Sequence, residues 1–178
     1  MENTVFGVYD NVIDLDNSLN ELADQGYTEG DITIITKESS IDKIRVDNNT
    51  EAGIRNGAKT GGLLGGILGL IAGVGTLTVP GIGALFVTGP LAVALGITGI
   101  IGTTAAGAIT GAIAGGLVTG LKELGIDENI ARKYEEEVEK GNYLLYVYLK
   151  EDTDILNVEE TLRNNGAYSI NNLNLLIE

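Results

Sequence analysis

The sequence predicts an α+β fold: a ferredoxin-like head built from two βαβ repeats and interrupted by a long glycine-zipper apolar helical hairpin. Two observations predict this architecture. The strand and helix patterns at the start of the chain recur near its other end, and all 11 basic and 25 acidic residues lie outside the stretch between Lys59 and Lys122. We therefore expect residues 1–50 to form the first half of the head, residues 51–125 the hairpin, and residues 126–178 a linking helix and the second half of the head.

The first repeat begins with the segment TVFGVYD (residues 4–10), whose alternating apolar and small or polar residues predict a strand. The next segment, NVIDLDNSLNELADQG, has its apolar residues on one helical face and Gly26 as a stop signal. The segment DITIITK (residues 31–37) predicts a second strand, which completes a βαβ unit.

The second repeat has the same elements in the same order. YLLYVYLK (residues 143–150) predicts a strand, EDTDILNVEETLRNNG predicts a helix that ends at Gly166, and INNLNLLIE predicts a final strand. A shift of 140 residues superimposes the two copies without a gap, for example Val8 on Tyr148 and Gly26 on Gly166. Because a lone βαβ unit leaves both sheet edges open, we expect the two copies to pair into one four-stranded sheet with its helices on one side.

An additional helix is predicted just before the second repeat, over the segment DENIARKYEEEVEKG. Asp127 is its expected N-cap and Gly141 its expected end. Ile130, Tyr134 and Val138 share one apolar stripe, so we expect the charged run between them to face solvent.

Glycine recurs at every fourth position from Gly57 to Gly73, and glycine or threonine does so from Gly99 to Thr119, which places these small residues on one face of a helix. Such small residues let two helix backbones approach closely. Glycine also costs about 1 kcal/mol relative to alanine in a water-exposed helix, which favours a buried or membrane setting. The expected helix-packing interface consists of Gly57, Gly61, Gly65, Gly69, Gly73, Gly99, Gly107, Gly111 and Gly115.

Two prolines separate these two glycine ladders. Proline disrupts a helix interior, so a helix that begins near residue 57 should end by Val79, and Pro90 suits the first turn of the next helix. We therefore expect the apolar region to fold back on itself between them. The expected hairpin turn consists of Pro80, Gly81, Gly83, Gly89 and Pro90.

The lengths of the two arms are compatible with a membrane. Residues 60–79 supply the ~20 uncharged residues that one bilayer crossing needs, and residues 90–121 are more than one crossing needs. If the two repeats form one sheet, both ends of the hairpin emerge on the same side, so the hairpin crosses twice or re-enters. The alternatives are the buried core of a soluble homo-oligomer and a self-contained soluble core.

The composition argues against several classes of function. A net charge of −14 without a basic cluster argues against nucleic acid as a partner. A chain without histidine or cysteine has no imidazole base, no Ser-His-Asp triad, no disulfide and no thiolate metal site. GIRNGAKT lacks the spacing of a phosphate loop, and DLDNS lacks the glycine and the distal glutamate of a calcium loop. We therefore expect no enzyme activity, catalytic residue, metal, cofactor or small-molecule substrate.

The motifs of the chain resemble those of a family of bacterial stress proteins. The resemblance rests on VFGVYDN, ELADQGY and DITIITK in the first repeat, on the centre VPGIGALFVTGPLA, and on LGIDENIARKYEEEVEKGNYLLYV. These segments resemble the general stress protein 17M and low-temperature-induced protein group. The resemblance implies a stress-induced bacterial protein and provides no catalytic residues to carry over.

These observations lead to two hypotheses of function. The first is a non-enzymatic stress-response protein that inserts its glycine-zipper hairpin into the membrane and self-associates. Its head would be cytoplasmic, because MENTVFGVYDN lacks the pattern of a signal peptide, and its partners would be further copies of itself and membrane lipid. The alternative is a soluble cytoplasmic structural protein whose apolar hairpins assemble into a homo-oligomeric particle or filament.

Overall fold

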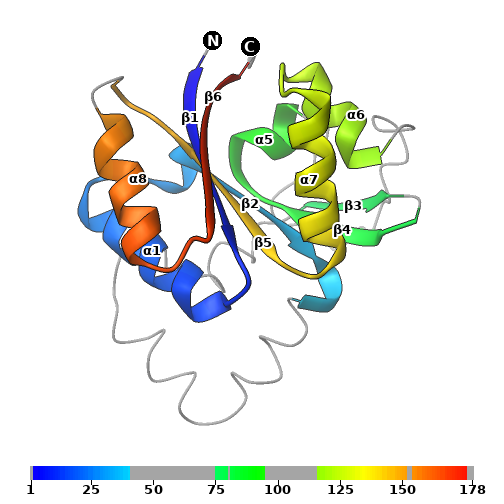
Figure 1. Ribbon diagram of the computed structural model, residues 1–178, viewed down its shortest axis with the longest axis horizontal. Coiled ribbons are helices and arrows are strands. Elements are labelled where there is room, and N and C mark those ends of the chain that lie inside the picture. Colours follow the sequence, from blue (N-terminus) through cyan, green and yellow to red (C-terminus); the bar gives the residue numbers. More distant parts are fainter. Residues whose placement is uncertain (1, 41–74, 80, 95–115, 152–153, 176–178) are drawn as a thin grey trace, which may run out of the picture.

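The structure, a computed structural model, describes residues 2–40, 75–79, 81–94, 116–151 and 154–175. Within these residues, a six-stranded antiparallel sheet in the order β3-β4-β2-β5-β1-β6 lies between two layers of helices (Figure 1). The strands are β1 (Glu2–Tyr9), β2 (Ile32–Lys37), β3 (Gly75–Val79), β4 (Gly83–Val87), β5 (Tyr143–Tyr148) and β6 (Ser169–Leu175). The helices are α1 (Val12–Asp24), the 3-10 helix η1 (Glu29–Asp31), α5 (Gly89–Ala94), α6 (Gly116–Glu123), α7 (Glu128–Glu139) and α8 (Ile155–Asn164).

The two predicted repeats, β1-α1-β2 and β5-α8-β6, join through the antiparallel pairing of β1 with β5. Phe6 lies opposite Tyr146 in this pairing, and these two residues are equivalent under the shift of 140 residues. A pseudo-two-fold axis therefore passes between them and relates the two repeats. The expected pairing of the two copies in one sheet is confirmed.

The repeats differ in length after their helices. Phe6 of β1 pairs with Asn171 of β6, whereas the equivalent Tyr146 of β5 pairs with Thr33 of β2. The exact counterpart of Asn171 under the shift would be Asp31, two residues before Thr33. The short helix η1, which ends at Asp31, occupies this part of the first repeat. The alignment without a gap thus ends at the glycines that follow α1 and α8.

Two predicted helix signals, Asp127 as an N-cap and Gly26 as a helix stop, are confirmed, and Asn11 is an N-cap that was not predicted. Asn11 caps α1 by accepting a hydrogen bond from the backbone of Ile13 at 2.8 Å. Asp127 caps α7 in the same way, through Asn129 at 2.9 Å. Gly26, directly after the end of α1, has a φ of +90°, the left-handed conformation expected of a glycine stop.

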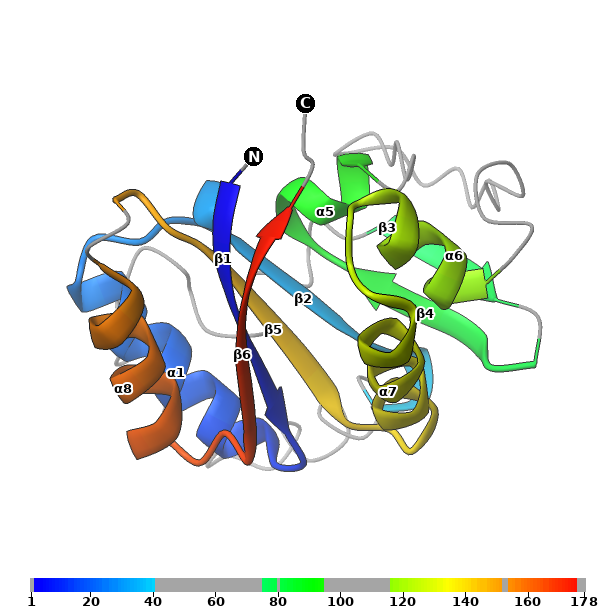
Figure 2. The same cartoon turned by 45° about the horizontal axis from the view of Figure 1, so that its top comes forward.

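Helices cover both faces of the sheet, so the expectation of helices on one side is wrong (Figure 2). On one face, α1 and α8 bury Leu15, Leu19, Leu22, Val158 and Leu162. On the other face, α5, α6 and α7 bury Leu91, Leu117, Leu121, Ala131, Tyr134 and Val138. The prediction lacked the second layer because it placed the residues before the second repeat outside the head.

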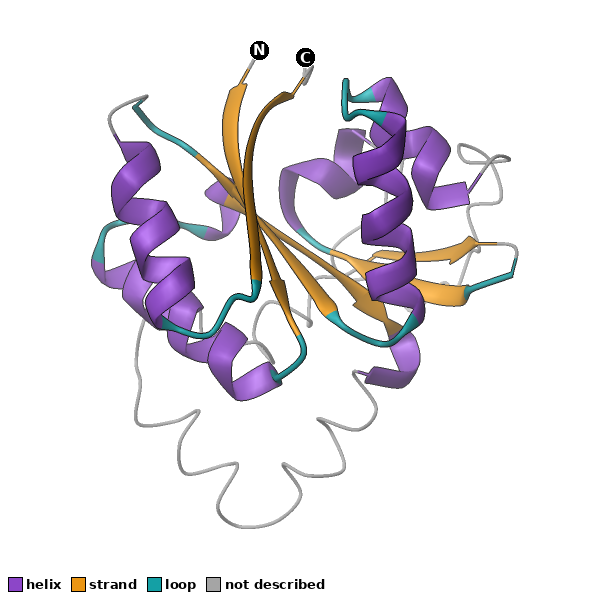
Figure 3. Cartoon of the chain, viewed as in Figure 1, coloured by secondary structure: helices purple, strands orange, loops and turns teal. Residues whose placement is uncertain are grey.

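The centre of the apolar region forms a β-hairpin that extends the sheet. Gly75–Val79 is strand β3, which corrects the prediction of a helix up to Val79, and β4 pairs with β2 through Ile35 opposite Val87. β4 occupies part of the segment expected to be a turn between two helices. The physical reason is burial, because Leu85 and Val87 are fully buried against the existing sheet. Figure 3 shows this hairpin beside the other strands.

The start of α5 is held closely against β2. Thr88 exchanges two hydrogen bonds with Ile34: its backbone N–H donates to the Ile34 carbonyl at 3.0 Å, and its Oγ1 accepts from the Ile34 N–H at 2.8 Å. Leu91 donates its N–H to Thr33 Oγ1 at 3.2 Å. The side chain of Leu91 is fully buried, so α5 is fixed to the sheet both by backbone polar groups and by apolar packing.

The remaining predictions for the apolar region concern its glycine interface, its membrane crossing and its boundaries. The nine glycines of the expected packing interface and Pro80 lie outside the described residues. In the part of the chain that the structure describes, no helix is both long enough and apolar enough to cross a membrane. The predicted domain boundaries stay a prediction, although β3, β4, α5 and α6 fall within residues 51–125 and pack on the head.

Gly89 is the glycine whose replacement should most disturb this packing. Its φ is +67°, and a Cβ built on it would lie 1.9 Å from the carbonyl oxygen of Ile32 in β2. We expect Gly89→Ala to lower the free energy of unfolding by about 3 kcal/mol or more, because a left-handed conformation and overpacking act together. Urea unfolding measures this change.

Gly81→Ala is the matched control, because Gly81 has a φ of +87° but no atom within 4 Å of its built Cβ. The conformational effect alone should lower the free energy of unfolding by about 1–2 kcal/mol. Equal destabilisation by the two variants would contradict the close contact of α5 with β2.

Candidate functional site

A polar cavity lies between α1 and α8. Its volume is about 520 Å³. The side chains that line it are mostly carboxylates and amides, with one lysine and one tyrosine. They are Glu21, Gln25, Tyr27, Lys150, Asp154, Asn157, Glu160, Thr161 and Asn164.

The repeat symmetry of the head brings the wall residues together. Glu21 of α1 and Thr161 of α8 are equivalent residues of the two copies, 140 positions apart, and Thr161 Oγ1 donates to Glu21 Oε1 at 3.1 Å. Gln25 Nε2 donates to the same Thr161 oxygen at 2.7 Å, and Asn165 Nδ2 donates to Glu21 Oε2 at 2.6 Å. The pseudo-two-fold axis therefore leads from the Phe6–Tyr146 pair to this polar contact between the helices.

Lys150 closes one end of the cavity. Its Nζ donates to the carbonyl of Gly26 at 2.5 Å, lies 3.5 Å from Asp31 Oδ2, and sits 5.5 Å from the ring centroid of Tyr27. The Tyr27 hydroxyl donates to Asp154 Oδ2 at 3.4 Å. Burial, together with the negative charge of Asp154, raises the pKa of Tyr27 to about 12. Tyr27 is therefore a hydrogen-bond donor at neutral pH and not a base.

This arrangement can bind polar groups, but it does not form a catalytic constellation. Glu21 is occupied by the hydroxyl of Thr161 and the amide of Asn165, and Lys150 by Gly26 and Asp31. An activated nucleophile would need an adjacent general base, which neither the bound carboxylate nor the protonated tyrosine provides. Across the described residues, no group of three or more acidic, histidine or cysteine side chains is placed to hold a metal ion.

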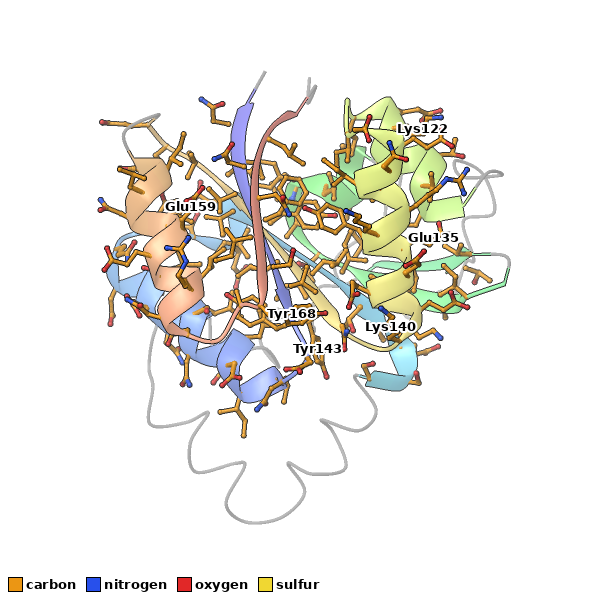
Figure 4. All side chains as sticks on the ribbon, in the orientation of Figure 1. Lys122, Glu135, Lys140, Tyr143, Glu159 and Tyr168 are labelled. Carbon is orange, nitrogen blue, oxygen red and sulfur yellow. The ribbon has the colours of Figure 1, made fainter. Side chains whose placement is uncertain are left out.

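A second, smaller cavity of about 250 Å³ lies between α7 and β6. At its edge Tyr168 hydrogen-bonds to Glu137 Oε2, and Asn142 Nδ2 donates to both of these groups, at 2.9 Å and 2.6 Å respectively. Lys140 Nζ lies 2.8 Å from Glu137 Oε1. Figure 4 labels Tyr168 and Lys140 at the same end of the sheet. This network joins the end of α7 to the start of β6.

Glu137 is the titratable group at the centre of that network. Burial raises the pKa of Glu137, but the hydrogen bonds from Lys140, Tyr168 and Asn142 together hold it below its ordinary value. Burial and the neighbouring Glu137 carboxylate raise the pKa of Tyr168. The two groups are therefore carboxylate and neutral phenol at neutral pH, a structural pairing and not a proton-transfer pair.

The structure places the predicted turn residues in three different settings. Gly81 lies in the turn between β3 and β4, and Gly83 begins β4. Gly89 and Pro90 are the first two residues of α5. Pro90 thus lies in the first turn of a helix, as predicted. This helix follows strand β4, however, and not another helix.

The residues of the large cavity were not identified from the sequence. Tyr27 and Lys150 follow a helix stop and a strand, positions that carry no chemical pattern of their own. The signal that could have identified Glu21 and Thr161 is their equivalence under the repeat shift, since equivalent residues of two paired helices meet at the axis that relates them. Repeat symmetry therefore predicts contacts that residue types alone do not.

The described fold is a mixed α/β domain whose antiparallel sheet joins two βαβ repeats, with polar cavities and no catalytic constellation among its described residues. Within that class of domain, residues 4–81 match the family model of the heat induced stress protein YflT domain. The match confirms the resemblance to a stress-protein family and suggests a role in the stress response. It covers the first repeat and continues through β3. Searches of curated proteins and of solved structures give no match.

Glu137 provides a test of the network between α7 and β6. Because its pKa in the folded protein is lowered, its contribution to stability is fully present above the pKa of the unfolded state and is lost as pH falls through the folded value. We expect Glu137→Gln to lower the free energy of unfolding at pH 7 by about 1–2 kcal/mol. The difference from the wild type should shrink below about pH 4, as urea unfolding at several pH values would show.

Glu136→Gln is the control, because Glu136 is an exposed neighbour on the same helix. It should change the free energy of unfolding by less than about 0.5 kcal/mol at either pH. A Glu137→Gln effect that does not depend on pH would show that the carboxylate charge is not what stabilises this network.

Proposed function

We propose that the protein is a non-enzymatic stress-response protein that associates with further copies of itself through two glycine-rich apolar segments. The observation that carries this proposal is the docking of residues 75–94 on the head. They come from the middle of the charge-free stretch, yet β4 pairs with β2 and Leu91 is buried in the core. The docked residues 75–94 divide the charge-free stretch into two segments. Each segment lies between two elements of the head.

The arrangement of the head supports a ferredoxin-like description of its four repeat strands. Their order is β2-β5-β1-β6, and every neighbouring pair is antiparallel. A βαβ unit at each end of the described chain is the pattern of the split βαβ fold. In this description the insertion enters between the two units, and the β-hairpin and α5 are additions to the β2 side.

The composition of the two segments supports association between copies. Each has small residues at intervals of four, and residues 60–74 and 95–115 carry no charge. A glycine-rich helix is poorly stable when its glycine face is exposed to water, and it gains most from another helix that approaches closely along that face. A second copy supplies a matching surface without any further partner.

Membrane insertion is a second candidate, favoured by the absence of charge between Lys59 and Lys122. Both flanks of each segment belong to one head, so a segment that enters the bilayer has to return to the same side. Residues 41–74 are fewer than the ~40 that two helical crossings need, and residues 95–115 are fewer still. Residues 75–79, which a full first crossing would require, are in β3. The candidate therefore takes the form of re-entrant or interfacial insertion.

Gly65→Ile tests the association. If Gly65 lies where two helix backbones meet, a branched side chain there should cost about 1–3 kcal/mol of packing, which weakens association by roughly 5- to 150-fold. We expect the variant to lose the association that depends on the ladder, seen as a lower molar mass in size-exclusion chromatography coupled to light scattering. Because isoleucine is more apolar than glycine, any fraction bound to membranes should not decrease.

Leu64→Ile is the matched control, because it introduces the same side chain on a different face of the ladder. It should leave both the oligomer and the membrane fraction unchanged. An unaltered oligomer in Gly65→Ile would refute self-association through the ladder, and recovery of the wild-type protein without lipid would refute membrane insertion.

A further inference from the structure

β6 presents an outer edge that no strand of the described chain covers. β6 ends the sheet and pairs with β1 on its inner side. Its counterpart in the first repeat is β2, which pairs with β5 on its inner side and with β4 on its outer side. The pseudo-two-fold symmetry of the head thus provides two equivalent edges, of which one is covered by an antiparallel strand.

The residues of β6 lack the features that usually protect a sheet edge. Edge strands are commonly blocked by lysine, proline or inward-pointing charges. The sequence of β6, SINNLNL, contains none of these and carries no charge over seven residues. The chain has a net charge of −14, so two copies repel one another over most of their surface. The uncharged β6 strands of two copies can approach with little repulsion between them.

Side chains on the two faces of β6 fix its position against the flanking helices. Asn172 Nδ2 donates to Glu159 of α8 at 2.9 Å, and Asn171 Nδ2 donates to the Tyr134 hydroxyl of α7 at 3.2 Å. Figure 1 shows β6 between these two helices. The strand is therefore held in an extended conformation and does not have to be ordered when it pairs.

The face of β6 next to α7 also borders the cavity of about 250 Å³, which is lined in part by Ile130, Tyr134 and Asn171. Leu173 lies on the same face of β6 and is partly buried against that helix layer. Tyr168, which lines this cavity, is 51 % exposed. On the other face of the sheet, Leu156 of α8, one helical turn before Glu159, is 75 % exposed. Tyrosine is enriched in protein–protein interfaces, and an exposed aliphatic side chain such as Leu156 adds apolar area that a second copy can bury.

We propose that two copies of the chain pair through β6, antiparallel about a two-fold axis at Asn172, so that their sheets form one continuous sheet. This register pairs all seven residues of each strand. It places Asn171 opposite Leu173 of the second copy, on the same face of the sheet, so that this leucine covers the cavity beside α7. The contact is separate from the glycine-rich segments and does not depend on them.

Cysteine cross-linking of the full chain tests this pairing, because the natural sequence has no cysteine. Residues directly opposite in an antiparallel pair have Cα atoms about 4.5–5.5 Å apart, within the range of a disulfide. We expect Asn172→Cys to give a disulfide-linked dimer under mild oxidation, detected by non-reducing electrophoresis. The same dimer should form when Gly65→Ile is added, which separates this contact from the one under Proposed function.

Asn164→Cys is the control, since Asn164 is exposed on α8 and faces the cavity beside α1 instead of β6. It should cross-link weakly, in proportion to random collisions. If Asn172→Cys forms no more dimer than Asn164→Cys, the proposal is overturned, whether the edge is then covered by another part of the chain or left exposed.

Proline substitution provides a second test that does not require cross-linking. The N–H groups of successive strand residues point to opposite sides, so one of Asn171→Pro and Asn172→Pro removes an outward N–H and leaves the pairing with β1 intact. In the Gly65→Ile background, that variant should melt like its parent, yet its molar mass by sedimentation should fall by half. An unchanged molar mass in a proline variant that melts like its parent would overturn the proposal.

Discussion

The rest of the structure depends on the antiparallel pairing of β1 with β5. The two strands of each βαβ repeat are not neighbours in the sheet, because a strand of the other copy lies between them. The pairing centred on Phe6 and Tyr146 places one strand of each repeat between the two strands of the other. The inner edges of both repeats are thereby covered. The two rings contact edge to face, with centroids 4.0 Å apart, so the axis of the repeat is also a site of aromatic packing.

This pairing explains where the other parts of the chain lie. The axis places α1 beside α8, where Glu21 meets Thr161, and leaves the opposite face of the sheet for α7 and the elements of the insertion. Tyr134 of α7 stacks on Phe6 at 5.4 Å, which fixes the second layer over the same axis. The outer strands β2 and β6 become the edges, and the β-hairpin covers the first of them.

The polar groups of the described surface are held in hydrogen-bonded and ion-paired networks. Burial raises the pKa of Tyr27 and Tyr134 to about 12 in each case, which keeps these hydroxyls neutral as donors. At the two cavities, Glu21 and Glu137 are held by lysine, amide and hydroxyl groups of the head itself. A stress-response role through association of copies uses such a surface without requiring a reaction, and it is consistent with the family match over residues 4–81.

The sequence by itself determined the local elements of the two repeats and the ends of their helices. Asp127 and Gly26 act through a hydrogen bond or a backbone conformation within a few residues, so their roles follow from residue type and position. Only the tertiary structure decided that GTLTV and GALFV are strands, since short apolar runs suit either a helix or a strand until a sheet edge is available. The polar cavity was likewise beyond prediction from residue types, because Glu21 and Thr161 meet through the packing of α1 on α8 and have no pattern in the local sequence.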